Sequence, residues 1–159
     1  MSCKAMSVSA QPERSEDLPS TISRGYAAIA DSVPLARRAL VTVAEAAGVE
    51  DDQLEAVALA SSEALTNAVR HAYGGRPGQI RVSAWTTGET FVVIIADDGR
   101  GLQVQSDAAG LGVGLGLIAK VTDELEIVQP ACGGTEVQMR FSLDRDGPPS
   151  GGHASGGHP

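Results

Sequence analysis

Hydrophobic and polar residues between positions 51 and 73 recur with the period of an α-helix. On one side, the core positions step by threes and fours: Leu54, Val57, Ser61, Leu65, Ala68 and Ala72. On the opposite edge, Glu63, Asn67 and His71 follow one another every four residues, so their side chains stack along one line of the helix. The segment is therefore predicted to be an amphipathic helix with a polar edge available for chemistry.

A second helix is predicted to begin behind Asp31 or Ser32 and to end at Gly48. Pro34 lies in its first turn, where a missing backbone N–H is tolerated. Its expected core stripe consists of Leu35, Ala39, Leu40, Val43 and Ala47. Residues 18–29, which precede this helix, have a weak pattern and are an ambiguous candidate for an edge strand.

The period of two that is typical of β-strands appears in the second half of the chain. Residues 79–87 alternate apolar with polar side chains, and a turn at residues 87–89 leads back into residues 91–96, which are apolar on both faces. A strand of that kind is expected in the middle of a sheet. After a short predicted helix at residues 115–122, two further strands are expected at residues 124–128 and 136–143.

This order of elements predicts an α+β fold. Tight turns between consecutive strands favour antiparallel pairing, and helices can cover one face of the sheet. We expect a two-layer sandwich of a mixed, mostly antiparallel sheet with helices on one face. One domain is expected at residues 17–143, between a polar, disordered arm (residues 1–16) and a disordered Gly/Pro/Ser-rich tail (residues 144–159), neither of which can build a core.

Composition narrows the classes of function. A chain of 159 residues with 42% hydrophobic residues has material for one core. The net charge of -8 argues against a direct nucleic-acid binder, which needs clustered basic residues. No apolar run approaches the roughly 20 residues of a membrane span, and the N-terminus has no signal-peptide core. Cys3 and Cys132 have no metal-ligand spacing, and we expect both to be reduced thiols in the cytoplasm.

Two carboxyl groups suggest chemistry. Glu63 lies one helical turn before Asn67, which suits phosphoryl transfer because a carboxylate can take a proton and an amide oxygen can bind Mg²⁺. The alternative is an ordinary polar helix surface. Asp97 ends a buried strand and needs a hydrogen-bond donor, which the exocyclic amine of adenine can provide. The alternative for Asp97 is a turn-forming aspartate.

Glycines recur between residues 110 and 116, ahead of the short predicted helix. Such a segment allows backbone N–H groups to approach a phosphate, although a hinge or flexible linker is the alternative. It is not a Walker loop, because no GK[ST] follows, and it lacks the spacing of the dinucleotide fingerprint. Gly133, Gly134 and Thr135 precede the last strand. The threonine hydroxyl there either binds a nucleotide-associated water or satisfies the turn.

Four motifs occur in order along the chain: E-x3-N-A-x2-H-A from Glu63, D-x-G-x-G from Asp97, G-x-G-L-G-L from Gly112, and GGT from Gly133. Together they resemble the gyrase and histidine-kinase-like ATPase superfamily, and most nearly its branch of anti-sigma-factor serine/threonine kinases. The resemblance covers about residues 18–143. The chain departs from the pattern in its enlarged glycine stretch and in its Gly/Pro-rich tail.

The resemblance implies a role for each motif. Asn67 would bind Mg²⁺, and Glu63 would be the general base for the incoming hydroxyl. Asp97 would accept a hydrogen bond from the adenine of ATP, with Thr135 holding a water beside it. The other nucleotide-binding positions would be Gly99 and Gly101, which line the base pocket, and Gly112, Gly114, Leu115 and Gly116, in the lid and phosphate cradle.

The resemblance also implies an activity and partners. The protein would be a cytoplasmic, homodimeric, ATP-dependent anti-sigma factor that sequesters a sigma factor and phosphorylates an anti-anti-sigma antagonist of the STAS type. One alternative is a non-catalytic ATP-binding module that binds a sigma factor or antagonist without phosphoryl transfer. Another is a detached histidine-kinase catalytic domain. Histidine kinases carry a phosphoacceptor-helix domain ahead of the pocket, for which we expect no room in this sequence.

Overall fold

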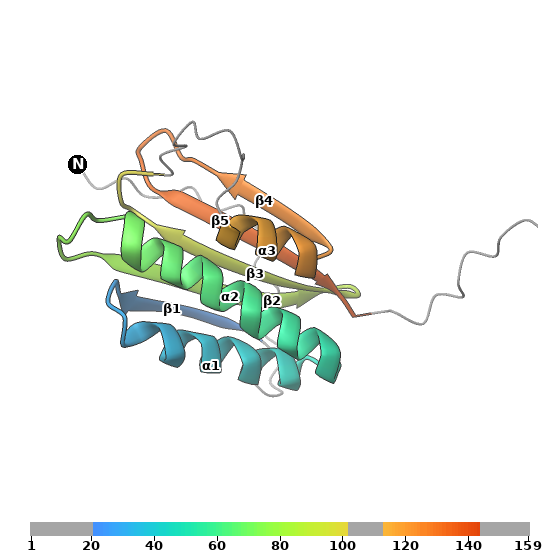
Figure 1. The fold of residues 1–159 in the computed structure, drawn as a ribbon. Coiled ribbons are helices and arrows are strands. Elements are labelled where there is room, and N and C mark those ends of the chain that lie inside the picture. Colours follow the sequence, from blue (N-terminus) through green and yellow to red (C-terminus); the bar gives the residue numbers. More distant parts are fainter. Residues whose placement is uncertain (1–20, 102–112, 144–159) are drawn as a thin grey trace, which may run out of the picture.

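The computed structural model describes residues 21–101 and 113–143. Along the chain, the elements are β1 (Ile22–Ala27), α1 (Ser32–Ala46), α2 (Asp51–His71), β2 (Gln79–Thr87), β3 (Thr90–Asp97), α3 (Val113–Val121), β4 (Glu124–Val128) and β5 (Thr135–Ser142) (Figure 1). The predicted arm and tail lie wholly outside the described residues, as do residues 102–112, so the predicted division into arm, domain and tail stays a prediction.

The sheet has the strand order β1-β2-β3-β5-β4. The four strand pairings in the described residues are all antiparallel, so the sheet is not mixed as expected from the sequence. The predicted α+β class is confirmed, and β3 lies in the middle, as its apolar character on both faces indicates. The ambiguous segment at residues 18–29 contains β1, which forms one edge of the sheet.

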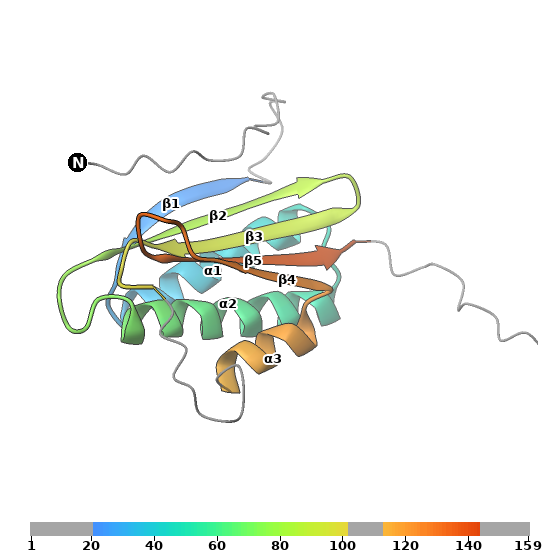
Figure 2. The same ribbon diagram turned by 90° about the horizontal axis from the view of Figure 1, so that it is seen from above.

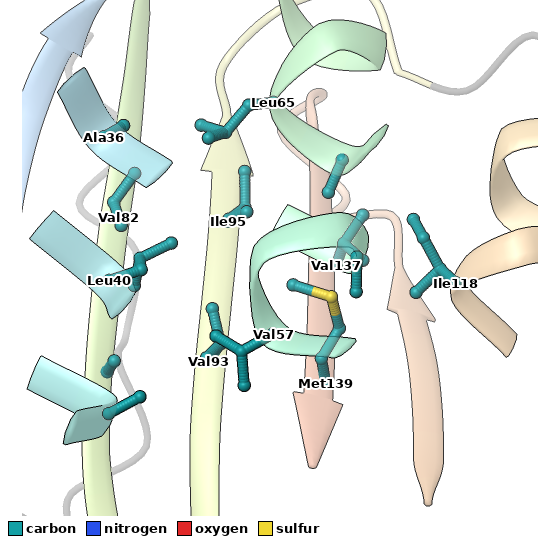
Figure 3. Close-up of a cluster of buried hydrophobic side chains, with 14 of the residues drawn as sticks. Ala36, Leu40, Val57, Leu65, Val82, Val93, Ile95, Ile118, Val137 and Met139 are labelled. Carbon is teal, nitrogen blue, oxygen red and sulfur yellow. The ribbon is translucent and has the colours of Figure 1, made fainter. Parts of the chain in front are cut away.

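The helices of the described residues, α1, α2 and α3, cover the same face of the sheet (Figure 2). Between the two layers, Leu40 of α1, Val57 of α2 and Ile118 of α3 are fully buried. They point toward side chains of the sheet such as Val93 and Met139, which are also fully buried (Figure 3). Apolar area removed from water stabilises a fold by roughly 25 cal/mol per Å². The helix–sheet interface therefore holds the elements that carry the polar edge of α2.

The predicted core stripe of α1 is wrong at Leu35, whose side chain is 61% exposed. The buried residues of α1 are Ser32, Ala36, Leu40, Val43 and Ala44. Leu35 and Ala36 each lie four residues, or about one turn, before another apolar residue, so periodicity alone does not choose between them. The small side chain of Ala36 lets the helix pack closely on its neighbours, and this turns Leu35 toward solvent.

The central helix α2 buries the side that the sequence predicts. Val57, Ser61 and Leu65 are almost completely inaccessible, while Glu63 and Asn67 on the other edge are half-buried. The polar edge of α2 therefore lies at the border between the helix layer and solvent.

No helix in the described part of the chain is long and apolar enough to cross a bilayer.

Candidate functional site

Three chain segments meet at one end of the sheet: the C-terminal end of α2, the end of β3 and the start of β5 (Figures 1 and 2). Asp97 is the last residue of β3, and its register partner on β5 is Thr135. Its partner on the other side is Ile80 of β2. Because β3 is central, Asp97 is held from both sides by paired backbone.

The carboxyl group of Asp97 is buried, with only 7% of the residue exposed. Its Oδ1 accepts a hydrogen bond from the Gly99 N–H at 2.9 Å. Burial raises the pKa of Asp97, while hydrogen bonds from the backbone of Gly99 and Thr135 oppose that rise. A buried carboxylate with few donors remains a strong acceptor, so this position suits a ligand that presents an N–H group.

Glycines around Asp97 allow three backbone segments to touch. An ideal Cβ on Gly99 would lie 2.1 Å from the carbonyl oxygen of Ala72, at the end of α2. One on Gly134, where φ is +89°, would lie 2.1 Å from the carbonyl oxygen of Asp97. Gly101, with φ of +80°, has its ideal Cβ 3.3 Å from the Gly134 carbonyl oxygen. Side chains are therefore excluded from these contacts, and the segments lie closer together than other residues allow.

Gly134 is the residue of this group to which the sequence motifs assign no role. The GGT motif indicates Thr135 as the functional residue, and the pair of glycines before it is the available signal for Gly134. The positive φ and the backbone contact become visible only when β3 and β5 are placed side by side.

Replacing Gly134 with alanine is expected to lower the free energy of unfolding by about 2 kcal/mol more than replacing Gly75 does. Both residues have a positive φ, which costs an alanine roughly 1 kcal/mol. Only Gly134 adds a steric conflict, because no heavy atom lies within 4 Å of the ideal Cβ on Gly75. Urea unfolding of the two variants measures the difference, and equal destabilisation would contradict the contact with Asp97.

The polar edge of α2 meets the first turn of α3. An ideal Cβ on Gly114 would lie 2.9 Å from Oε2 of Glu63 and 3.4 Å from Nδ2 of Asn67. The structure therefore brings together three residues that the motifs single out from two distant segments. The third polar residue of the edge, His71, is exposed, and its backbone carbonyl accepts a hydrogen bond from Nε of Arg100 at 2.9 Å.

The remaining residues of the glycine stretch differ in their surroundings. Outside its own helix, no heavy atom of the described residues lies within 4 Å of the ideal Cβ on Gly116. Leu115 is 5% exposed and its side chain belongs to the hydrophobic core, which leaves only its backbone for a ligand. Gly112 lies outside the described residues.

The two groups of site residues are joined by α2. Glu63 and Asn67 lie on this helix, and its last residues contact the turn at Asp97 and Gly99. Helical rise of about 1.5 Å per residue places Asn67 within about 8 Å, along the helix axis, of the end that contacts this turn. The arrangement fits an elongated ligand with an N–H-bearing ring at one end and an anionic group with a cation at the other.

Asp97 is expected to make the stability of the fold depend on pH. Burial raises the folded-state pKa of Asp97, so above about pH 3.9 the folded protein keeps a proton that the unfolded chain has lost. The contribution of Asp97 to the free energy of unfolding is therefore lost as the pH rises through the raised pKa. Asp97→Asn lacks this titration. We expect the melting temperature of the variant to rise relative to the original protein as the pH increases from about 3.9 through the raised pKa of Asp97. A difference in melting temperature between the two proteins that stays constant across this pH range would contradict the prediction.

Comparison with known proteins shows which proteins this chain is similar to. Residues 26–141 match the family model described as the histidine kinase-like ATPase domain. The chain is 30% identical over 132 residues to the serine-protein kinase RsbW of Bacillus pumilus (strain SAFR-032), covering 72% of this chain and 80% of that protein. It is 28% identical over 122 residues to the anti-sigma F factor of Thermoanaerobacter sp. (strain X514), covering 68% of this chain and 85% of that protein.

A solved structure shares the fold. The crystal structure of the RsbU and RsbW domains of Rv1364c from Mycobacterium tuberculosis superposes with a TM-score of 0.62 at 22% identity. The match covers 77% of this chain and 31% of that longer chain. At this identity, the likeness supports the assignment of the fold.

Proposed function

Because this chain belongs to the histidine kinase-like ATPase family, in its group of anti-sigma-factor kinases, we propose that it transfers the γ-phosphate of ATP to a serine or threonine of a protein. The observation that carries the proposal is the close approach of Gly114 to both Glu63 and Asn67, together with the buried carboxylate of Asp97 beside the C-terminal end of the same helix. This reaction needs a carboxylate that can take a proton, an amide that can bind the metal ion and a carboxylate that recognises the adenine. All three groups lie where α2 meets the sheet.

The pocket for the adenine is proposed to lie around Asp97. Its carboxylate would accept a hydrogen bond from the exocyclic amine, which offsets the cost of burying the charge. Gly99 and Gly101 would line this pocket with their backbone, because the missing side chains let the turn pack against Ala72 and Gly134. Thr135 is the register partner of Asp97 and is 7% exposed, so a water held by its hydroxyl would lie next to the base.

Asn67 is proposed as the protein ligand of Mg²⁺. Its amide oxygen is a hard donor of the kind that this ion prefers, and Mg²⁺ is usually held by one or two protein groups together with phosphates and waters. The described residues contain no group of three or more His, Cys, Asp and Glu that would form a metal site alone. When bound, the ion neutralises charge on the phosphates. The backbone of Gly112, Gly114, Leu115 and Gly116 would surround those phosphates.

Glu63 is proposed as the general base. As the acceptor hydroxyl oxygen forms its bond to the γ-phosphorus, the bond between that phosphorus and the bridging oxygen of ADP breaks. The hydroxyl proton passes to the Glu63 carboxylate, which lies beside the first turn of α3 and is half-buried. A positioned base of this kind typically contributes a rate factor of about 10²–10⁴.

The names of the relatives support a role in the control of transcription. They include a serine-protein kinase and an anti-sigma F factor. We therefore propose that this protein, as a cytoplasmic homodimer with ATP bound, holds a sigma factor inactive. Its phosphorylated substrate would be a STAS-type anti-anti-sigma antagonist, and release of the sigma factor would follow from a stress signal that leaves this antagonist unphosphorylated.

Incubation with labelled Mg-ATP and candidate antagonist proteins tests the proposal. The expected result is an acid-stable phosphate on a serine or threonine of one antagonist, located by mass spectrometry. Nucleotide-dependent capture of a sigma factor or antagonist without phosphate transfer would instead support a binding module. An acid-labile phosphate would indicate the chemistry of a histidine kinase.

A further inference from the structure

We infer that Tyr73 is a positioning residue for nucleotide recognition, which fixes the turn that carries Asp97 against the end of α2. The hydroxyl of Tyr73 accepts a hydrogen bond from the backbone N–H of Asp98 at 3.0 Å and donates one to the carbonyl oxygen of Gln79. One side chain thus connects α2, the start of β2 and the turn after β3. The inference rests on the proposed ATP site, whose adenine end this turn forms.

The position of the tyrosine ring is fixed by Gly78. An ideal Cβ on Gly78 would lie 2.3 Å from Cε1 and 2.4 Å from Cδ1 of Tyr73, so the ring lies directly against the glycine Cα. Gly78 is not among the glycines with a positive φ. Its backbone therefore accepts any residue, and the contact with the ring is the reason for glycine here.

The same turn is fastened to α2 at two further points. The backbone N–H of Arg100 donates to the carbonyl oxygen of Ala72 at 2.8 Å, and its Nε donates to the carbonyl oxygen of His71. These bonds satisfy carbonyl groups that the end of a helix leaves unpaired, and the cation is favourable at that end. Tyr73 and Arg100 hold the turn on either side of Gly99, whose N–H binds the Asp97 carboxylate.

The ion pair between Arg81 and Asp98 is a weaker restraint on the turn. Its atoms are 2.6 Å apart, but the two side chains are 46% and 65% exposed. Exposed pairs contribute little because water and salt screen them. The hydrogen bonds of Tyr73 are also solvent-exposed, but the residue is half-buried and its hydroxyl binds two backbone groups, whereas the ion pair joins two long, exposed side chains. The tyrosine is therefore the stronger determinant of where the backbone of Asp98 lies.

Tyr73 also fixes the distance between the two ends of the nucleotide site. Asn67 lies six residues before Tyr73 on the same segment, so the tyrosine ties the adenine end of the site to the end proposed to bind the metal. One ATP molecule has to reach both ends at once, and small displacements of positioned groups weaken such simultaneous contacts. Tyr73 acts through Asp98 and Gly99 rather than by touching the nucleotide.

Tyr73→Phe tests this role, with displacement of labelled ATP by unlabelled Mg-ATP or Mg-GTP as the measurement. The variant loses both hydrogen bonds of the hydroxyl, to Asp98 and to Gln79. This is expected to weaken ATP binding about three- to ten-fold and to leave GTP binding unchanged, so the preference for ATP over GTP becomes smaller. Tyr26→Phe, which removes the other tyrosine hydroxyl of the chain, should change neither. An unchanged ATP affinity, or equal losses for both nucleotides, would overturn the inference. Absence of ATP binding by the unmodified protein would instead refute the proposed function.

Gly78→Ala provides an independent test, because the added methyl group must displace the Tyr73 ring. We expect it to reproduce the loss of adenine preference, whereas Gly25→Ala, whose ideal Cβ lies 3.8 Å from its nearest neighbour, should not. In a Tyr73→Ala background, Gly78→Ala should have no further effect, since the ring is gone. Additive losses in the double variant would show that Gly78 acts separately from Tyr73.

Discussion

Replacing Asn67 with alanine is expected to abolish measurable binding of Mg-ATP, a loss of at least about 100-fold in affinity. The amide is the protein ligand proposed for Mg²⁺, and it lies beside the first turn of α3, where the ideal Cβ of Gly114 comes within 3.4 Å of it. Without this ligand, the phosphates and the cation lose their attachment to α2. Isothermal titration calorimetry with Mg-ATP measures the effect.

Thr66→Ala is the matched control, because Thr66 is a half-buried polar residue on the same helix, about 100° around its axis from Asn67. It should bind Mg-ATP like the original protein. Both variants should unfold at similar temperatures, since neither side chain belongs to the core. Binding by Asn67→Ala within about threefold of the original affinity would remove this residue from the metal site.

Replacing Glu63 with glutamine is expected to slow phosphate transfer by about 100-fold or more while nucleotide affinity changes little. Glutamine keeps the size of the side chain beside Gly114, so the packing of α2 on α3 is preserved. It cannot take the proton of the acceptor hydroxyl. Single-turnover transfer of labelled phosphate to the antagonist, measured beside equilibrium binding of ATP, separates the chemical step from binding.

The control for this variant is Glu55→Gln, which removes an exposed acid from the same helix. Its transfer rate should equal that of the original protein. If Glu63→Gln retained full transfer, the carboxylate would have another role. If its ATP affinity fell along with the rate, Glu63 would contribute to binding rather than to proton transfer.

The sequence predicts the elements that repeat a clear pattern over many residues. The 21 residues of α2 contain enough turns for a buried side and a polar edge to be distinguished. The strand at Thr90–Asp97 is apolar on both faces, and this correctly indicates a central place in the sheet. Because Glu63 and Asn67 lie on one such element, their proximity follows from helical geometry alone.

Contacts between distant segments are harder to predict. Leu35 has the right hydrophobicity and spacing for the core, yet the packing of α1 selects Ala36. The role of Gly134 depends on the carbonyl oxygen of Asp97, 37 residues earlier in the chain. Gly78 is explained by the ring of Tyr73, whose position no periodicity specifies. In each case the deciding neighbour comes from tertiary structure, which a local pattern does not contain.

The tight backbone contacts around Asp97 restrict how nucleotide preference can change by mutation. Gly99 and Gly134 each have a carbonyl oxygen 2.1 Å from where a side chain would begin, so neither can acquire a new specificity group. The two register partners of Asp97 are Ile80 and Thr135, and Ile80 is a fully buried residue of the hydrophobic core. Directed evolution toward another purine would therefore be most productive at Thr135.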